Sequence, residues 1–302
     1  MILSNPLRQQ TALRAYRPSI CVQCLYNPKS QRRRLHRVPQ LTHDAAFAEH
    51  GVGRMLGPES YITAWRDYQS YLVDRLNKMT ADTKDATRPT KDILVEYARS
   101  PTHASLFNHA SMAWNNHSFF STLSPTPSPI SPSLEKKISS SFSSIESFRA
   151  TFLATANAMF GPGFVWLVKR DDYNRNSQAL PELAILTTFI AGSPLPRAHY
   201  RKQEQDLNTS LQAGMFGPRS GNEPMMAPGA VMLEPMLCVN TWQHVWLHDY
   251  GFGGKREYLE RWWDSVDWDV VERNGQFDAF GGRRGWGLGM ATGTGSDLGA
   301  GR

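Results

Sequence analysis

The chain has 302 residues, enough for one large domain or two of ordinary size with a substantial core. No apolar run approaches the ~18–20 residues that a membrane-spanning helix needs, so a soluble protein with no membrane partner is expected. The formal net charge of +6 at pH 7 would favour nucleic acid as a partner if it were spread over the whole chain.

The basic residues are concentrated near the N-terminus instead. Residues 1–43 hold eight Lys or Arg and no Asp or Glu, whereas residues 44–302 hold 25 basic and 27 acidic residues. An acid-free segment rich in Arg, with Ser and Gln, is typical of a mitochondrial presequence, expected here over residues 1–40, and it predicts a location in the mitochondrial matrix. The alternative is a disordered basic arm that binds RNA.

The use of cysteine agrees with this interpretation. Cleavage of the presequence is expected near Arg34 to Leu41, and it would remove Cys21 and Cys24. A single C-x-x-C pair is weak evidence for a metal or redox site when no second pair accompanies it. Only Cys238 would remain in the mature chain, so disulfides are not expected to stabilise the fold.

Residues 41–123 have the pattern of a helical hairpin. Apolar side chains three and four residues apart predict a long amphipathic helix that starts near Glu59 and Ser60. The residues of this stripe are Ile62, Trp65, Tyr68, Leu72 and Leu76. The stretch "TKDILVEYARSPTHASLFNHASMAWNNHSFFSTL" then continues as helix, turn and helix.

The second half of the chain mixes helices with strands. Residues 124–133, "SPTPSPISPS", form a Pro/Ser hinge that is not expected to sustain a helix. A helical segment capped by Ser144 follows, residues 191–229 have the composition of an insertion loop, and residues 275–302 form a Gly-rich tail. The strand-like runs are Phe164–Arg170, Leu183–Ile190 and Val231–Val239. An α+β domain is therefore predicted over residues 134–274.

Three motifs in this order make the chain resemble a known family. They are "FNHASMAWNNHSFF", "FGPGFVWLV" and "NTWQHVWLHDYGFGGKREYLERWWDSVDWDVV". Together they resemble the iron/manganese superoxide dismutases over roughly residues 41–274, apart from the insertion loop. The resemblance implies an N-terminal helical hairpin followed by a C-terminal α/β domain with a small three-stranded sheet. Function still has to be argued from the site, because one fold can carry unrelated functions.

The resemblance also implies where a metal would be bound, because the family uses three His and one Asp. His117 matches the second ligand, His244 matches the last, and Asn240 stands where the family has Asp. The first His is expected about two turns before a Tyr that matches Tyr71, and the run Ile62–Trp65 at that place contains no ligating side chain. Two of the four ligands are therefore missing.

The missing ligands argue against a redox-active metal. Manganese and iron lie low in the order of divalent affinities and depend on a full set of hard ligands, and a neutral amide cannot balance charge on the metal. Other supporting positions of the family differ as well. Gln243 replaces a Glu that bridges to the partner subunit, Leu247 replaces a Tyr, and Met112 and Phe160 occupy the two positions that can supply a Gln. The sequence therefore predicts no cofactor and no enzymatic activity.

The two retained histidines have two interpretations. One is a residual zinc or other metal site that uses both imidazoles and an outside group. The other, favoured here, is a pair of buried, hydrogen-bonded histidines in a former active-site cavity, with Trp166, Trp242 and Tyr71 packed around it. His248 and Asp249 are neighbours on one helix and are not expected to face each other as a catalytic pair.

With a mitochondrial leader and a dismantled site, the chain is most similar to the catalytically inactive dismutase-like proteins of the fungal mitochondrial small ribosomal subunit. The resemblance implies a structural role in mitochondrial translation. It also implies proteins of the small subunit as partners, with a related dismutase-like subunit as the partner in a heterodimer. The rival interpretation is a mitochondrial superoxide dismutase with altered ligands, and a third is an interaction protein that acts outside the ribosome.

Four residues are candidates for contacts with such partners. Gln243 is expected at the subunit interface, and Arg283, Arg284 and Trp286 lie in the tail, where they could hold RNA phosphate or a protein groove. The alternative for the tail is disorder without a partner. The nearly neutral charge of residues 44–302 favours mainly protein contacts, with limited contact to ribosomal RNA through the tail or the insertion loop.

Overall fold

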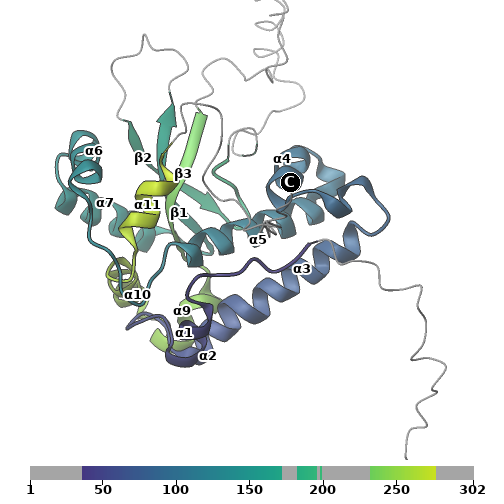
Figure 1. Ribbon diagram of the computed structural model, residues 1–302, viewed down its shortest axis with the longest axis horizontal. Coiled ribbons are helices and arrows are strands. Elements are labelled where there is room, and N and C mark those ends of the chain that lie inside the picture. The colour runs from purple at the N-terminus through teal and green to yellow at the C-terminus, as the bar shows by residue number, and fades with distance from the viewer. Residues whose placement is uncertain (1–35, 172–181, 196–197, 199–231, 277–302) are drawn as a thin grey trace, which may run out of the picture. The chain divides into compact units, whose positions relative to one another are not determined.

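The computed structural model describes residues 36–171, 182–195, 198 and 232–276 (Figure 1). By its contacts the chain divides into Met1–Arg34 and Leu35–Arg302, and every described residue belongs to the second unit. Most of the expected presequence, the insertion loop beyond residue 198 and the tail beyond residue 276 lie outside the described residues. Arg283, Arg284 and Trp286 are among them.

The first part of the unit is helical, as its apolar spacing predicts. Its elements are α1 (Asp44–His50), α2 (Pro58–Tyr61), the π-helix η2 (Ile62–Asp67), α3 (Tyr68–Met79), the short 3₁₀ turns η3 (Lys84–Thr87) and η4 (Pro101–His103), α4 (Thr90–Tyr97) and α5 (Ala104–Ser121). The expected long helix begins at Pro58, one residue before the predicted start, because Gly57 is the N-cap and proline is tolerated in the first helical position. In Figure 1, α3 and α5 run beside each other, and contacts along both helices hold them together.

Three buried amide contacts connect α5 to the long N-terminal helix formed by η2 and α3. The Gln69 Nε2 group donates to the Ala113 carbonyl oxygen at 2.9 Å. The Asn116 Nδ2 group donates to the Ala64 carbonyl oxygen and to Gln69 Oε1, both at 3.1 Å. Each such bond contributes about 0.5–1.5 kcal/mol to stability, and leaving one of these buried groups unpaired would cost more. The polar residues between the helices therefore fix one register for the hairpin.

The second part begins with two helices and continues into the sheet. Its elements are α6 (Pro132–Phe142), α7 (Ile145–Ala158), β1 (Gly163–Asp171), β2 (Leu183–Phe189), β3 (Met232–Asn240), α9 (Gln243–Tyr250), α10 (Lys255–Trp263) and α11 (Trp268–Asn274). Ser144 caps α7 by accepting from the Ser147 N–H at 3.1 Å, as predicted. The expectation that residues 124–133 sustain no helix is wrong for the last two of them. Helix α6 begins at Pro132, where its missing N–H costs nothing, and Ser131 caps it by accepting from the Leu134 N–H.

The three strands form one antiparallel sheet within the described residues, in the order β2-β1-β3. The central strand is fully buried around Trp166, whose indole N–H donates to Thr188 Oγ1 on β2 at 2.9 Å. Strand β3 tolerates Pro235 because it is an edge strand and the proline lies opposite a register shift between Leu167 and Val168. The predicted α+β fold with a small three-stranded sheet is confirmed.

Helices cover the sheet and bring the two parts of the unit together. Helices α5 and α11 pack against β3, α7 packs against β1, and α9 contacts both α2 and η2 (Figure 1). The end of β3 and the start of α9 thus face the π-helical turn of the long N-terminal helix. Asn240 and His244 lie at this junction, and His117 contacts Trp65 of the same π-helical turn.

Candidate functional site

The turn between β3 and α9 is held by Asn240. This residue is fully buried, and its Oδ1 accepts from the Trp242 backbone N–H at 2.9 Å. The neighbouring Thr241 donates to the carbonyl oxygen of Gly163 through both its backbone N–H and its hydroxyl. The Asn240 Nδ2 group, by contrast, is buried and has no hydrogen-bond partner among the described residues. Asn240 therefore shapes the turn as a neutral amide and supplies no negative charge.

His244 lies in the first turn of α9, between two aromatic rings. The centroid of its ring is 4.4 Å from that of Tyr68 and 5.7 Å from that of Trp242. Its Nε2 atom is buried and has no hydrogen-bond partner among the described residues. Burial lowers the pKa of His244 to about 4, so the imidazole is neutral at pH 7.

His117 lies on α5, facing the π-helical turn. Its ring centroid is 5.9 Å from that of Trp65, and burial lowers the pKa of His117 to about 4. The inward positions of that turn are Ala64 and Trp65, both completely or almost completely buried, while Thr63 is exposed. The side chain against His117 in that turn is therefore an indole, and the neighbouring buried side chain is a methyl group; neither ligates a metal.

The expected packing of aromatic residues around the site is right for Trp242 and wrong for Tyr71. Trp166 is buried, and its ring stacks on that of Trp114 on α5. Trp242 lies against His244, but Tyr71 is 54% exposed and contacts the ring of His109. Tyr68 takes the inward position instead. The physical reason is helical spacing, since Tyr68 is four residues from the buried Leu72 and shares its face, whereas Tyr71 projects to another side.

These residues do not fit the iron or manganese ion of the family they resemble. Such an ion needs hard, partly anionic ligands, and this site offers two neutral imidazoles, an amide and hydrocarbon. Within the described ranges, no group of three or more His, Cys, Asp or Glu is placed to hold a metal. Met112 is buried, and Phe160 is 99% exposed on the turn after α7, so neither supplies a polar group to the site. No catalytic step can be derived through a metal here.

The prediction that His248 and Asp249 do not face each other is wrong. His248 Nδ1 lies 3.1 Å from Asp249 Oδ1, and both groups contact the hydroxyl of Ser60 on α2. The side chains of His248 and Asp249 come together although they are neighbours on one helix, because both contact the same hydroxyl, that of Ser60 on another helix. The cluster is not a hydrolytic triad. Ser60 is buried and donates to the carboxylate rather than to the imidazole, and the same carboxylate accepts from the Gly57 N–H at 2.8 Å.

A group of exposed apolar residues lies near the same junction and was not predicted from the sequence. We call it the apolar surface, and it comprises Phe160, Phe189, Ile190 and Phe252. Hydrogen bonds join the segments that carry it, from the Ile190 N–H to the Pro162 carbonyl at 2.9 Å and from Lys255 Nζ to the Met159 carbonyl at 2.8 Å. Gln243, the predicted interface residue, is exposed at the start of α9. Exposed aromatic residues of this kind carry no periodic signal, so a helical or strand pattern could not reveal them.

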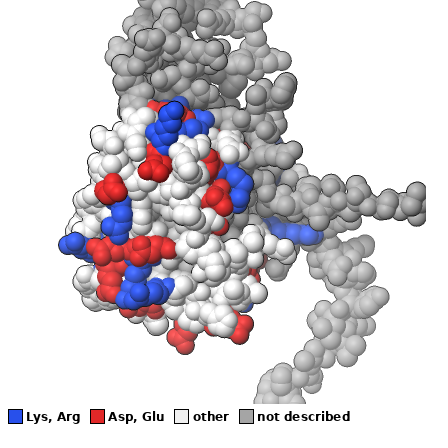
Figure 2. Space-filling model, turned by 60° about the vertical axis from the view of Figure 1, so that its left-hand side comes forward, with Lys and Arg blue, Asp and Glu red and all other residues white. Residues whose placement is uncertain are grey.

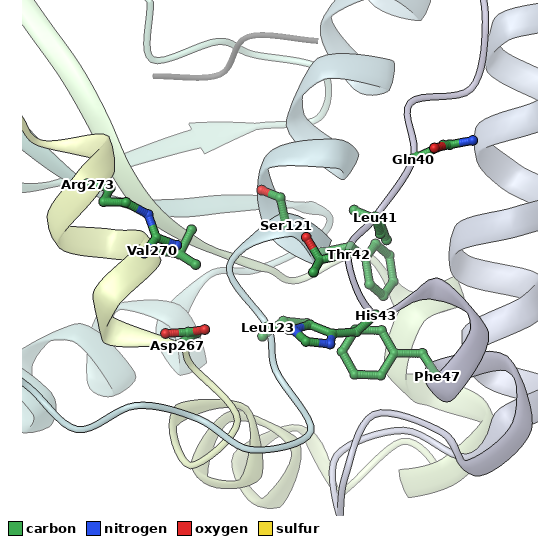
Figure 3. A pocket seen from close by; sticks show the side chains of 11 residues that line it. Gln40, Leu41, Thr42, His43, Phe47, Ser121, Leu123, Asp267, Val270 and Arg273 are labelled. Carbon is green, nitrogen blue, oxygen red and sulfur yellow. The ribbon is translucent and has the colours of Figure 1, made fainter. Parts of the chain in front are cut away.

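A pocket of about 170 Å³ lies apart from the former metal site (Figure 3). The segment before α1, the end of α5 and α11 line it, and His43, Asp267 and Arg273 point into it in Figure 3. Asp267 is also the N-cap of α11, where it accepts from the Asp269 N–H at 3.2 Å. None of the positions that match metal ligands lines this pocket.

Comparison with known proteins agrees with the geometry. Residues 130–199 and 217–274 match the family of iron/manganese superoxide dismutases, C-terminal domain. The chain is 28% identical over 246 residues to the small ribosomal subunit protein mS43 of Schizosaccharomyces pombe, covering 78% of this chain and 83% of the relative. It is 29% identical over 218 residues to the small ribosomal subunit protein mS42 of the same organism, and the match covers 70% of this chain and 84% of the relative. It is 25% identical over 204 residues to an iron superoxide dismutase of Babesia bovis, and the match covers 67% of this chain and 78% of the relative.

The structure also bears on membrane association. In the part of the chain that the structure describes, no helix has both the length and the apolar character needed to cross a membrane.

Proposed function

We propose that this chain, whose residues 130–199 and 217–274 match the C-terminal domain of iron/manganese superoxide dismutases, is a structural component of the mitochondrial small ribosomal subunit and not an enzyme. The observation that carries the proposal is the composition of the site that matches the family's metal centre, where Asn240 and the run Ile62–Trp65 stand in place of ligands. The similarity to two proteins of a small ribosomal subunit supports the same conclusion. The Arg-rich, acid-free leader supports a mitochondrial location.

A superoxide dismutase with altered ligands is the alternative, because the chain is also similar to an iron superoxide dismutase. The two functions make opposite demands on the site. Dismutation needs a redox metal whose charge is balanced by an anionic ligand, whereas a structural subunit needs only a packed core. In this site His117 and His244 are neutral, and Asn240 bonds the backbone of its own turn. That arrangement favours the structural role.

The decisive experiment is a magnesium-containing sucrose gradient of mitochondrial lysate, probed for this protein. Manganese and iron content and superoxide dismutation are measured across the same fractions. We expect the protein to sediment with small ribosomal subunits, and its slow-sedimenting fraction to carry neither metal nor activity. A slow-sedimenting pool that contains manganese or iron and dismutates superoxide would overturn the proposal.

We further propose that the chain pairs with a related dismutase-like subunit. Two relatives from one organism, about equally similar to this chain, are both named as small ribosomal subunit proteins. Related chains associate most readily through similar patches around an approximate two-fold axis. The exposed Gln243 together with the apolar surface offers such a patch, because exposed clusters of large apolar side chains mark interaction sites. A neutral Gln can donate and accept hydrogen bonds with either a like or an unlike partner.

Contacts with ribosomal RNA are proposed to be limited to the tail and the insertion loop. Arg283, Arg284 and Trp286 combine two phosphate-binding groups with an aromatic ring on which a base can stack. On the face of the described unit shown in Figure 2, acidic and basic side chains lie intermingled. No single-sign surface for nucleic acid is visible on that face, so the unit itself is proposed to contact mainly proteins.

A further inference from the structure

The first described residue of the chain is fixed to helix α3 by a two-way backbone contact. The His36 N–H donates to Asn77 Oδ1 at 3.1 Å, and Asn77 Nδ2 donates to the His36 carbonyl oxygen at 3.0 Å. One amide side chain thus satisfies both backbone groups of a residue that precedes every helix of the unit. His36 is only 7% exposed, so this residue is packed against the folded unit and does not project into solvent.

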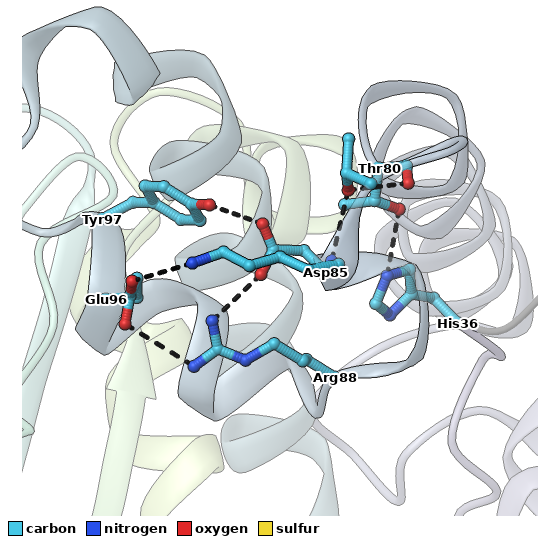
Figure 4. Close-up of polar contacts among 8 residues, drawn as sticks. His36, Thr80, Asp85, Arg88, Glu96 and Tyr97 are labelled. Carbon is cyan, nitrogen blue, oxygen red and sulfur yellow. Dashed lines mark hydrogen bonds and ion pairs between the residues drawn. The ribbon is translucent and has the colours of Figure 1, made fainter.

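The side chain of His36 adds a second attachment (Figure 4). Its Nε2 lies 3.2 Å from the hydroxyl of Thr80, which is buried and donates to the Leu76 carbonyl at 2.8 Å. Burial lowers the pKa of His36, which keeps the ring neutral beside that hydroxyl. The turn beneath it is itself rigid, because Asp85 accepts from Arg88 at 2.9 Å and from the Tyr97 hydroxyl at 2.5 Å. His36 therefore docks on a well-ordered part of the fold.

The other end of this segment is anchored in the core. Leu41 is buried, and α1 begins three residues later at Asp44. Residues 36–41, which we call the strap, are thus held at both ends, at α3 by His36 and in the core by Leu41. The strap also supplies Gln40 and Leu41 to the wall of the pocket in Figure 3.

We propose that the basic leader is removed by hydrolysis of a peptide bond on the amino side of His36, so that the mature chain begins no later than this residue. The inference rests on the proposed mitochondrial function, which supplies the leader-removing protease. Water adds to the carbonyl carbon and the C–N bond breaks. The leader leaves with a new carboxylate, and the mature chain keeps the new amino group.

The contacts of His36 set this limit. A chain that starts at His36 still has N–H donors at its terminal ammonium for Asn77 Oδ1 and still has the carbonyl that accepts from Asn77 Nδ2. A chain that starts at Arg37 has neither, and it would leave the amide of Asn77 and the buried hydroxyl of Thr80 without these partners. His36 is therefore the last residue at which the mature chain can begin and keep the strap attached.

The first test is the amino-terminal sequence of the protein recovered from small-subunit fractions of a mitochondrial gradient. We expect the first residue at His36 or upstream of it, with part of the leader absent. A first residue within 37–41 would overturn the limit, and an intact Met1 would overturn the cleavage. Either result can occur in a protein that sediments with the ribosome, so this outcome is separable from failure of the proposed function.

The second test asks whether Asn77 holds the strap. Trypsin is added to the folded full-length protein, and the rate of cleavage after Arg37 is followed by mass spectrometry. We expect Asn77→Ala to raise this rate at least tenfold, since proteolysis requires the strap to detach locally. The exposed Asn157 on α7 provides the matched control, and Asn157→Ala should cleave at the wild-type rate.

Circular dichroism shows whether Asn77→Ala remains folded under the digestion conditions. If it does not, Thr80→Val decides the question. It removes the partner of the His36 imidazole but leaves the backbone contact, and it should accelerate the cut by a smaller factor. Wild-type cleavage rates in folded variants of both kinds would overturn the role of these contacts.

Discussion

The ring of Tyr68 on α3 lies against the imidazole of His244 on α9, with 4.4 Å between the ring centroids. This contact joins the long N-terminal helix to the turn that follows β3. Its two partners are a half-buried phenol and a neutral imidazole, and burial raises the pKa of Tyr68 to about 12 while it lowers that of His244 to about 4. His244, which matches a metal ligand of the family, is here in contact with a phenol ring, and both rings are uncharged at pH 7.

Replacing His244 by a ring of similar size should therefore be tolerated. His244→Phe removes the buried Nε2, which has no hydrogen-bond partner in the described part of the chain, and we expect the free energy of unfolding to change by less than about 1 kcal/mol. His244→Ala leaves a cavity beside Tyr68 and should lower the free energy of unfolding by about 2–4 kcal/mol. Urea titrations followed by tryptophan fluorescence measure both. Equal losses for the two variants would mean that the imidazole has a polar partner.

Acid should destabilise the protein through its two buried histidines. His117 and His244 have pKa values of about 4 in the folded state, against about 6.5 in the unfolded chain, so the unfolded state binds more protons between these values. Stability is fully present above pH 6.5 and falls as the pH drops towards 4. Each group contributes up to about 3 kcal/mol to this loss. Thermal unfolding at half-unit pH steps measures it, and the double variant His117→Gln/His244→Gln should show a flatter profile over that range.

Restoring the family's carboxylate should not restore the metal. Asn240→Asp places an anion at a fully buried position that offers two neutral imidazoles and a methyl group, and we expect a loss of about 2–4 kcal/mol in stability with no uptake of manganese or iron. Metal content after refolding with either ion is read by plasma mass spectrometry. Asn157→Asp adds the same charge at an exposed site and controls for it. Stoichiometric metal in Asn240→Asp would show that only one defect separates this chain from an enzyme.

The apolar surface should matter for assembly and not for folding. Phe160 is 99% exposed, so Phe160→Asp should change the free energy of unfolding by no more than about 0.5 kcal/mol. We expect it to reduce recovery of the related subunit with the tagged protein by at least tenfold. Tyr71→Asp alters another exposed aromatic residue, on α3, and should leave that recovery unchanged. Undiminished recovery with Phe160→Asp would place the partner elsewhere.

Sequence reasoning predicted the elements well where the signal is local. The stripe through Leu72 and Leu76 identified the long helix, and Ser144 marked the start of α7, because periodic burial and capping act within a few residues along the chain. The same reasoning failed for Tyr71, which was chosen because it matches a Tyr of the family, although Tyr68 is the tyrosine that shares the helical face of Leu72. It also failed at Pro132, where a residue that interrupts helices begins one.

The identity of the residues alone predicted that two of the family's four ligands are absent, since Asn240 and the side chains of the run Ile62–Trp65 are neither carboxylates nor imidazoles in any fold. Only the tertiary structure decided that His248 meets Asp249 and that His36 is fixed by Asn77. It also decided that Phe160 lies exposed beside the end of β2. The reason is distance along the chain: these relationships depend on segments far apart in sequence, or on a third residue such as Ser60 that only folding brings between them.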